Sequence, residues 1–301
     1  MQRVWYQASD REPEDPKGLG VSSRVGYEGG TVNHVILDSE RCLHDGICVA
    51  SCPASILKLE PAGPTSSRGE HCLRCGHCVS VCRSGALALT TIPRSELRPV
   101  RDEHRTTPEQ VEQLLQARRS IRVFRDKAVP RELIERVLDS ARFAPSGVNL
   151  QPVGWTVLEG RERVHTLAAG VIEWARLLAE QKHPLAERFN FAGFVRGWNK
   201  GRDIVLRDAP CVVIAHAPTA ESMGIGAAII AMTYLQIAAA GLGLGTCWAG
   251  YLELALAQSP AVVNLAGIPE GRTARAASML GFAKHEYLQI PPRNPLRVNW
   301  V

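Results

Sequence analysis

The chain has 301 residues, of which 45% are hydrophobic and 22% are charged. This composition excludes a disordered chain and allows two domains with buried cores. The formal net charge is +5, but no block of lysine and arginine residues accompanies it, so we expect no nucleic-acid partner. The first residues lack the charged and apolar regions of a secretory signal, so we expect none.

Composition divides the chain into four segments. Residues 1–33 are polar and rich in glycine, proline and charge, and we expect a poorly ordered extension. Residues 34–92 hold seven of the nine cysteines and are predicted to form a small domain. Residues 93–106 are a charged linker, and residues 107–301 form a large domain. An odd number of clustered thiols indicates metal binding instead of disulfides, in a reducing, cytoplasmic location.

The two halves of the small domain have similar sequences. Residues 35–59 and residues 68–89 each contain a cysteine run that is followed by an apolar segment. This similarity predicts an internal repeat. The predicted strands are residues 35–37, 56–59 and 86–89.

The cysteine run at residues 72–82 has the spacing C-x2-C-x2-C-x3-C, which is typical of bacterial iron–sulfur proteins. The run at residues 42–52 has the same arrangement, with Asp45 at the position of the second cysteine. The small domain therefore resembles a bacterial dicluster ferredoxin. In that family the fourth cysteine of each run binds the cluster of the other run. The resemblance implies one ligand set of Cys42, Asp45, Cys48 and Cys82, and another of Cys52, Cys72, Cys75 and Cys78.

The resemblance implies a 4Fe-4S cluster at the ligand set that contains Cys72. It does not decide the cluster type at the set that contains Asp45. A carboxylate is a harder and weaker iron ligand than a thiolate, so that set could hold a 4Fe-4S or a 3Fe-4S cluster. Alternatively, Asp45 is a solvated turn residue and no cluster forms there. Zinc fits the runs poorly, because structural zinc usually takes two pairs of ligands.

Local patterns predict the first elements of the large domain. Residues 107–110 form a helix start, with Thr107 as the cap, proline at the first position and glutamine at the third. A second helix follows Pro130, where apolar residues recur at helical spacing. Residues 154–158 are a predicted strand. The uncharged run 223–252 is long enough for a membrane span, but its polar residues and glycines favour a buried helix, and we expect no membrane partner.

Five motifs of the large domain resemble the FMN-dependent nitroreductase family. They are R-R-S-x-R at 118–122, P-S-x-x-N-x-Q-P at 145–152, Asp-Ala-Pro at 208–210 before an apolar strand, the glycine-rich segment 241–250 and Arg-Asn-Pro-Leu at 293–296. The resemblance covers residues 107–301. It implies an α+β fold, in which a nitroreductase-like FMN domain with a mixed sheet flanked by helices follows a small ferredoxin-like α+β domain. The implied FMN-binding residues are Arg118, Arg119, Ser120, Arg122, Pro145, Ser146, Asn149, Gln151, Thr246, Cys247, Trp248, Gly250 and Arg293.

The residue chemistry of these motifs agrees with the resemblance. Arg118, Ser120 and Arg122 alternate along an extended segment, so they can point one way and bind a phosphate. The alternative is a solvated basic run at a helix end. The polar side chains of the loop 145–152 suit a flavin ring edge, and in the family this loop approaches the flavin of the other subunit, which implies a homodimer. Trp248 either lies against the ring or packs in the core.

The combined motifs predict an iron–sulfur flavoprotein oxidoreductase. We expect a one-electron donor such as a ferredoxin to pass electrons through the clusters to FMN, which reduces a small organic acceptor: a nitroaromatic, a quinone or an activated alkene. The flavin supplies the chemistry, and no side-chain acid or base is assigned. Two alternatives remain: NAD(P)H reduces the flavin and the clusters export electrons, or the protein is a redox-sensing binding protein.

Overall fold

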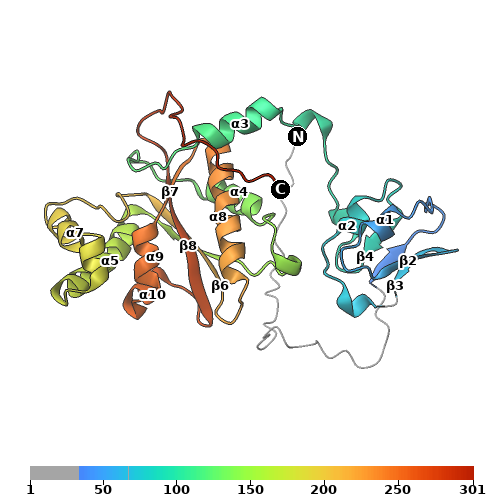
Figure 1. The fold of residues 1–301 in the computed structure, drawn as a ribbon, viewed down its shortest axis with the longest axis horizontal. Coiled ribbons are helices and arrows are strands. Elements are labelled where there is room, and N and C mark those ends of the chain that lie inside the picture. The colour runs from blue at the N-terminus through green and yellow to red at the C-terminus, as the bar shows by residue number, and fades with distance from the viewer. Residues whose placement is uncertain (1–33, 67) are drawn as a thin grey trace.

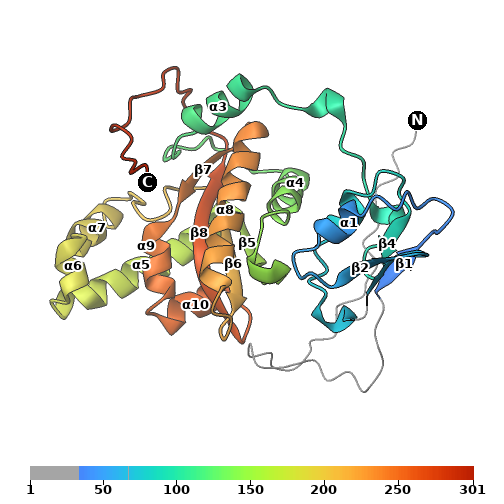
Figure 2. The ribbon, with the colours of Figure 1, turned by 45° about the vertical axis from the view of Figure 1, so that its right-hand side comes forward.

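The computed structural model describes residues 34–66 and 68–301, and the predicted extension 1–33 lies outside the described residues (Figure 1). A small unit and a large unit lie side by side in both views (Figures 1 and 2). The connection between them contains two short 3-10 helices, η2 (Arg94–Glu96) and η3 (Asp102–His104). The domain boundaries proposed from composition stay a prediction.

Two antiparallel strand pairs and two short helices build the small unit. Its elements are β1 (Val35–Leu37), α1 (Ile47–Ala50), β2 (Leu57–Glu60), β3 (Gly63–Ser66), η1 (Gly69–His71), α2 (His77–Ser80) and β4 (Leu87–Leu89). β1 pairs with β4, and β2 pairs with β3. Three of the strands lie within one residue of their predicted bounds. β3 has no predicted counterpart, because glycine and proline at its start weaken the strand signal.

The backbone of the small unit repeats in the way that its sequence predicts. Corresponding residues of the two halves adopt the same left-handed conformation, which reverses the chain between the ligand positions. The pairs are His44 and Arg74 (φ 52° and 50°), Gly46 and Gly76 (φ 68° and 74°), and Ser55 and Gly85 (φ 51° and 62°). Each half therefore wraps its cysteines with the same local path, and the resulting core contains Ile56, Leu57, Leu87 and Leu89.

The large unit begins with two amphipathic helices. α3 (Pro108–Ala117) starts as predicted: the Thr107 hydroxyl accepts a hydrogen bond from the amide of Gln110, and the Gln110 side chain accepts one from the amide of Thr107. None of the described α3 residues is buried, although several are apolar. α4 (Arg131–Ala141) instead buries one face in the core. The exposed apolar face of α3 is thus available for contact with another chain.

Four strands form the sheet of the large unit, in the order β5-β6-β8-β7, and all three pairings are antiparallel. The strands are β5 (Gly154–Glu159), β6 (Cys211–Pro218), β7 (Gly245–Trp248) and β8 (Arg272–Gly281). An isolated parallel bridge joins Ser120 to Thr246 at the β7 edge, so a mixed pairing occurs there. β6 is buried along nearly its whole length, which requires apolar cover on both faces.

Helices cover the sheet on both faces (Figure 1). α8 (Gly224–Gly241) packs on β6 and β8, and α4 packs against α8. The other face carries α5, α9 and α10, and two short helices pack against α5. These elements are α5 (Arg161–Glu180), α6 (Pro184–Arg188), α7 (Phe191–Trp198), α9 (Gly250–Leu256) and α10 (Pro260–Ala266).

α8 is long and apolar enough to cross a membrane by length and composition alone. Eight of its 18 residues are buried, among them Ala228, Met232 and Leu235, which lie in the core beneath the sheet. This placement is typical of a core helix in a globular protein. Ile225, Ile229, Ile230 and Tyr234 of the same helix are exposed.

Candidate functional site

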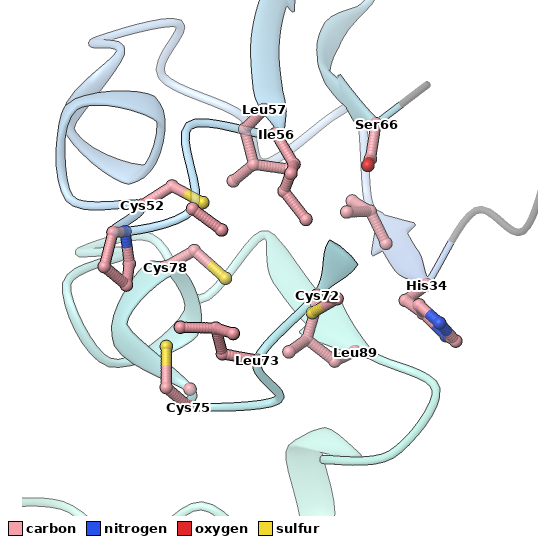
Figure 3. A pocket seen from close by; sticks show the side chains of 14 residues that line it. His34, Cys52, Ile56, Leu57, Ser66, Cys72, Leu73, Cys75, Cys78 and Leu89 are labelled. Carbon is pink, nitrogen blue, oxygen red and sulfur yellow. The ribbon is translucent and has the colours of Figure 1, made fainter. Parts of the chain in front are cut away.

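The thiols of the small unit gather in two pockets, one for each predicted ligand set. One pocket is lined by Cys52, Cys72, Cys75 and Cys78. We call it the second thiol pocket, because three of these cysteines belong to the second cysteine run. Figure 3 shows these side chains on three sides of one cavity, together with apolar side chains from β2 and β4. The cysteine from the first run therefore joins three from the second, in the arrangement that the ferredoxin resemblance implies. Iron ligation by these residues stays a prediction.

The first thiol pocket contains Cys42, Asp45, Cys48 and Cys82. One carboxylate oxygen of Asp45, Oδ1, accepts a hydrogen bond from the amide of Ile47 at 3.1 Å. Asp45 thus closes a turn just before α1 while it lines the pocket. Both roles considered for Asp45, the turn residue and the ligand, are compatible with this position, but the hydrogen bond to the Ile47 amide engages Oδ1.

The thiols in these pockets differ in acidity for local reasons. Burial raises the pKa of Cys78 to about 11 and also raises the pKa of Cys48. Burial alone would raise the pKa of Cys82, but backbone N–H groups at residues 85–87 and the Ser84 hydroxyl lower it. A bound cation is needed to hold the buried thiols as thiolates, since metal binding releases their protons.

The donor sets fit iron–sulfur clusters better than single metal ions. In the part of the chain that the structure describes, no group of three His, Cys, Asp or Glu side chains is close enough to hold one metal ion. The thiols instead surround a cavity. Soft thiolates spaced around a cavity are suited to an iron–sulfur cluster, whereas structural zinc needs four ligands converging on one point. This geometry argues against the zinc alternative.

The predicted phosphate-binding segment lies along the β7 edge. The Ile121 amide donates to the Thr246 carbonyl at 2.8 Å, and Ile121 is buried. Because side chains alternate on an extended segment, Ser120 and Arg122 point away from the core that holds Ile121. Arg118 and Arg119 are half-buried. The segment is therefore extended as predicted, with its polar side chains free to contact an anion.

Arg293 lies in the C-terminal segment beside the end of α3. It lines a cavity together with Leu115 and Gln116. These two residues come just before Arg118 in the sequence. The structure therefore brings Arg293 to the end of α3 from which the arginine segment emerges, where it would add a further cation to a phosphate site.

The loop 145–152 contains the short helix η4 (Gly147–Asn149). In space this loop lies beside the first residues of α8. The Ser146 hydroxyl accepts a hydrogen bond from the Gln151 amide at 2.8 Å, which closes the loop. Ser146 and Gln151 line a cavity with Ala227 of α8, and a Cβ atom on Gly147 would lie 2.4 Å from the Met223 sulfur. The loop is packed tightly against the first turns of α8.

The two predicted halves of the flavin site lie at opposite ends of α8. The loop 145–152 contacts Met223, just before α8, and shares a cavity with Ala227 and Ala231 in its N-terminal half, whereas Ile121 packs on Gly245, just after its C-terminal end. The part of the helix between Ala231 and Gly241 is about 15 Å long. The structure therefore brings the arginine segment and Arg293 together, but it does not bring the loop to them within one chain.

Trp248 in the segment Thr246–Gly250 makes a partly buried contact that the sequence patterns did not indicate. The Trp248 indole N–H donates to Glu253 Oε2 at 2.7 Å, and the Ala277 amide donates to Glu253 Oε1 at 2.6 Å. Burial raises the pKa of Glu253, although both hydrogen bonds lower it in part. Thr246 and Cys247 are buried, while Trp248 is half-buried and held by Glu253, so its indole orientation is fixed.

A second unexpected contact joins the two units. Nδ2 of Asn149 donates to the carbonyls of Leu73 and Arg74, both at 3.1 Å. Nε2 of Gln151 donates in turn to Oδ1 of Asn149 at 3.2 Å. Asn149 thus contacts the segment between Cys72 and Cys75, which lines the second thiol pocket. Contacts between residues 76 and 75 positions apart leave no signal in local sequence patterns.

The fold and the thiol pockets define a redox protein with a metal-binding domain ahead of an α+β domain. A family model described as the nitroreductase family matches residues 98–282, more than half of the chain, and a model described as a 4Fe-4S dicluster domain matches residues 34–83. The chain belongs to the nitroreductase family. It is therefore an oxidoreductase of the nitroreductase type, which confirms the predicted class and fold.

Three relatives match the chain in part. It is 30% identical to a chloronitrobenzene nitroreductase of Comamonas testosteroni, over 58% of this chain and 86% of that protein. It is 27% identical to a provisionally named NADH dehydrogenase/NAD(P)H nitroreductase of Archaeoglobus fulgidus, over 58% and 85% of the two chains. A relative of the same name from Methanothermobacter thermautotrophicus is 26% identical, over 46% of this chain and 60% of that protein.

Solved structures show the same fold. A Bacteroides fragilis nitroreductase with bound FMN aligns with a TM-score of 0.52 and 20% identity, covering 64% of this chain and 97% of that one. A Desulfitobacterium hafniense nitroreductase with bound FMN aligns with a TM-score of 0.52 and 23% identity, covering 65% and 100%. At these identities the likeness concerns the fold alone.

Proposed function

We propose that this protein is an iron–sulfur flavoprotein oxidoreductase that takes electrons from a one-electron donor, such as a reduced ferredoxin, and reduces a small organic acceptor. A nitroaromatic, a quinone and an activated alkene are the acceptor classes. One observation carries the proposal: Asn149 of the flavin-type loop is hydrogen-bonded to the segment that holds Cys72 and Cys75. A metal-binding domain joined to the large unit by the linker alone, with no electron transfer between them, would not require such a contact.

The cofactors of this proposal are FMN and two iron–sulfur clusters, which would supply one-electron carriers and a two-electron centre. Arg118, Arg122 and Arg293 would bind the phosphate dianion, because guanidinium groups form strong charge-assisted hydrogen bonds with phosphate. Glu253 would keep the Trp248 indole in place beside the ring. The second thiol pocket would hold a 4Fe-4S cluster, and the first a four-iron or three-iron cluster.

The proposal includes a homodimer. α8 exposes Ile225, Ile229, Ile230 and Tyr234, and α3 exposes Val111 and Leu115, each at 40% or more of its full area. Contiguous apolar side chains of this kind mark interaction sites. A second copy packed on this face would also explain why the two halves of the flavin site lie at opposite ends of α8, since each site would be completed by the other chain.

A second candidate function is favoured by the names of two relatives, which include NAD(P)H nitroreductase. In this alternative NAD(P)H reduces the flavin directly, and the clusters carry electrons outward to a partner. The two candidate functions use the same flavin and cluster sites and differ only in the direction of electron flow. We also propose a cytoplasmic location, supported by the seven clustered free cysteines of the small unit.

An optical spectrum of the anaerobically purified protein tests both candidates. The flavin band is recorded before and after addition of reduced ferredoxin, and in a separate sample NADH or NADPH. Bleaching by reduced ferredoxin alone supports the proposal, and rapid bleaching by the nucleotide supports the alternative. Absence of flavin even after incubation with FMN would contradict both. In a variant with serine at Cys72, Cys75, Cys78 and Cys82, ferredoxin-driven bleaching should be lost.

A further inference from the structure

The contact between the two units rests on a fully engaged side-chain amide. Nδ2 of Asn149 donates to the carbonyls of Leu73 and Arg74, and Oδ1 accepts from Gln151. The amide can therefore take only one orientation without losing a hydrogen bond. The segment between α4 and β5, which contains Asn149, faces the small unit in both views (Figures 1 and 2).

The carbonyls that Asn149 contacts belong to the segment between Cys72 and Cys75, two members of the second thiol pocket. The Arg74 amide also donates to the Cys72 sulfur at 3.4 Å, so this segment is folded around the thiol. The first thiol pocket, by contrast, is lined by residues between 42 and 87 only. The second pocket is therefore the one that the large unit contacts through Asn149.

The loop that carries Asn149 is held in a strained conformation. Val148, Asn149 and Gln151 have φ angles of 43°, 57° and 48°, in the left-handed region that residues other than glycine seldom adopt. Such strain persists only where surrounding contacts determine it, and it is concentrated at functional contacts. Here the loop is anchored at its far end, where Arg272 of β8 donates to the Pro152 carbonyl at 2.6 Å. The loop thus forms a rigid connection from the sheet to the second thiol pocket.

The position of this loop decides whether the second thiol pocket lies near the flavin bound by the same chain or near the flavin bound by the second copy. Asn149 lies at the N-terminal end of α8, and the arginine segment of the same chain lies beyond its C-terminal end. A cofactor whose phosphate is bound at Arg118 and Arg122 of this chain is therefore separated from the loop by the C-terminal half of that helix. In the proposed homodimer, the loop instead meets the flavin whose phosphate is bound by the second copy.

We infer that the second thiol pocket delivers electrons across the dimer, to the flavin whose phosphate is held by the other chain, and that Asn149 is the positioning residue for this transfer. The inference rests on the proposed function. Reduction of one flavin requires two electrons, which the ferredoxin-type donor supplies one at a time, and two protons from solvent. The first thiol pocket then lies on the donor side of the second.

Hydrogen exchange tests the docking contact without any turnover. Asn149→Ala removes the two hydrogen bonds that join the units, which should weaken the docking equilibrium about tenfold. Amide exchange should become faster in residues 70–76 and 145–151. Arg41→Ala is the matched control, because it removes a side-chain hydrogen bond to the Ser84 carbonyl beside the first pocket. It should leave exchange in residues 145–151 unchanged. Exchange in Asn149→Ala equal to that of the unaltered protein would overturn the docking role.

Mixed dimers, purified with two different affinity tags, test the transfer across the interface. One dimer pairs an Asn149→Ala chain with an Arg118→Ala, Arg122→Ala chain. Its single flavin, held by the intact arginines, faces the intact loop of the other chain, so reduced ferredoxin should bleach it at the unaltered rate. The control dimer pairs an unaltered chain with one that carries all three substitutions, and its flavin should be bleached about tenfold more slowly.

The two dimers contain the same substitutions and the same single flavin, which the flavin content verifies. Fast bleaching of the control dimer and slow bleaching of the first would show transfer within one chain and overturn the inference. If reduced ferredoxin does not bleach the unaltered protein at all, the proposed function fails as well. The two failures are therefore distinguishable.

Discussion

The Nε atom of Arg272 donates a hydrogen bond to Nδ1 of His216 at 2.6 Å inside the large unit. His216 is 4% exposed, and burial, reinforced by the guanidinium charge, lowers the pKa of its ring to about 4. The ring is therefore neutral at pH 7 and accepts through Nδ1. A Cβ atom on Gly154 would lie 2.5 Å from His216 Cε1, so glycine at the start of β5 makes room for the pair.

This pair predicts a loss of stability in mild acid. The pKa of His216 is lower in the folded chain than the ordinary value of 6.5, so on acidification the unfolded chain binds the proton first. The free energy of unfolding should fall by up to about 3 kcal/mol between pH 6.5 and pH 4. Chemical denaturation at a series of pH values measures this. His216→Asn keeps an acceptor for Arg272 without titrating, and its profile should be flatter; an equally steep profile would contradict the assignment.

Position 245, where the arginine segment runs beside β7, should accept no residue larger than glycine. A Cβ atom there would lie 2.5 Å from the Ile121 side chain, so Gly245→Ala must displace Ile121 and with it Ser120 and Arg122. We expect a loss of about 1–3 kcal/mol in the free energy of unfolding and weaker FMN binding in a fluorescence titration. Gly241→Ala is the control, because a Cβ atom at Gly241 meets nothing within 4 Å. Equal behaviour of the two variants would contradict this steric argument.

Asp45 should make the first thiol pocket the weaker iron site. One of its carboxylate oxygens is engaged by the Ile47 amide, and a carboxylate is a poorer iron ligand than a thiolate. We expect Asp45→Cys to retain about one more iron atom per chain during dialysis against a chelator. Asp102→Cys places the same new thiol in the exposed connection between the units and should retain no more iron than the unaltered protein. Identical iron contents in all three proteins would contradict the prediction that Asp45 weakens this site.

Glu253 should be required to orient Trp248. Its two oxygens accept hydrogen bonds from the Trp248 indole and the Ala277 amide, and glutamine can satisfy only one of these donors. Glu253→Gln should therefore cost about 1–3 kcal/mol in unfolding free energy and alter the tryptophan emission. Glu173→Gln, which breaks only a surface ion pair with Arg176, should change stability by less than about 1 kcal/mol. Unchanged emission in Glu253→Gln would argue that the indole does not depend on this carboxylate.

Short-range features of this protein could be predicted well. The Thr107 cap, the strands of the small unit and the repeated cysteine runs depend on residues a few positions apart, and they occur within a residue of their expected places. The sorting of eight ligand candidates into two pockets followed from family resemblance, and the structure groups the same residues. Cofactor binding by these residues, and by the flavin motifs, stays a prediction.

Long-range contacts could not be predicted in this way. Three contacts join positions that no local pattern relates: Glu253 with the Ala277 amide, Arg272 with His216, and Asn149 with residues 73–74. Each depends on how the whole sheet and its helices pack, because a hydrogen bond across many residues forms only when the intervening chain brings both groups together.

The sequence by itself determined the chemistry that is available to this protein: cysteine runs with one aspartate substitution, an arginine segment, and a polar loop between two prolines. Their spacing along the chain encodes this chemistry directly. Only the tertiary structure decided which of these groups can act together. The C-terminal half of α8 separates the arginine segment from the loop, while packing of the two units places the loop against the segment that carries Cys72 and Cys75. Distances between elements are set by core packing and not by residue order.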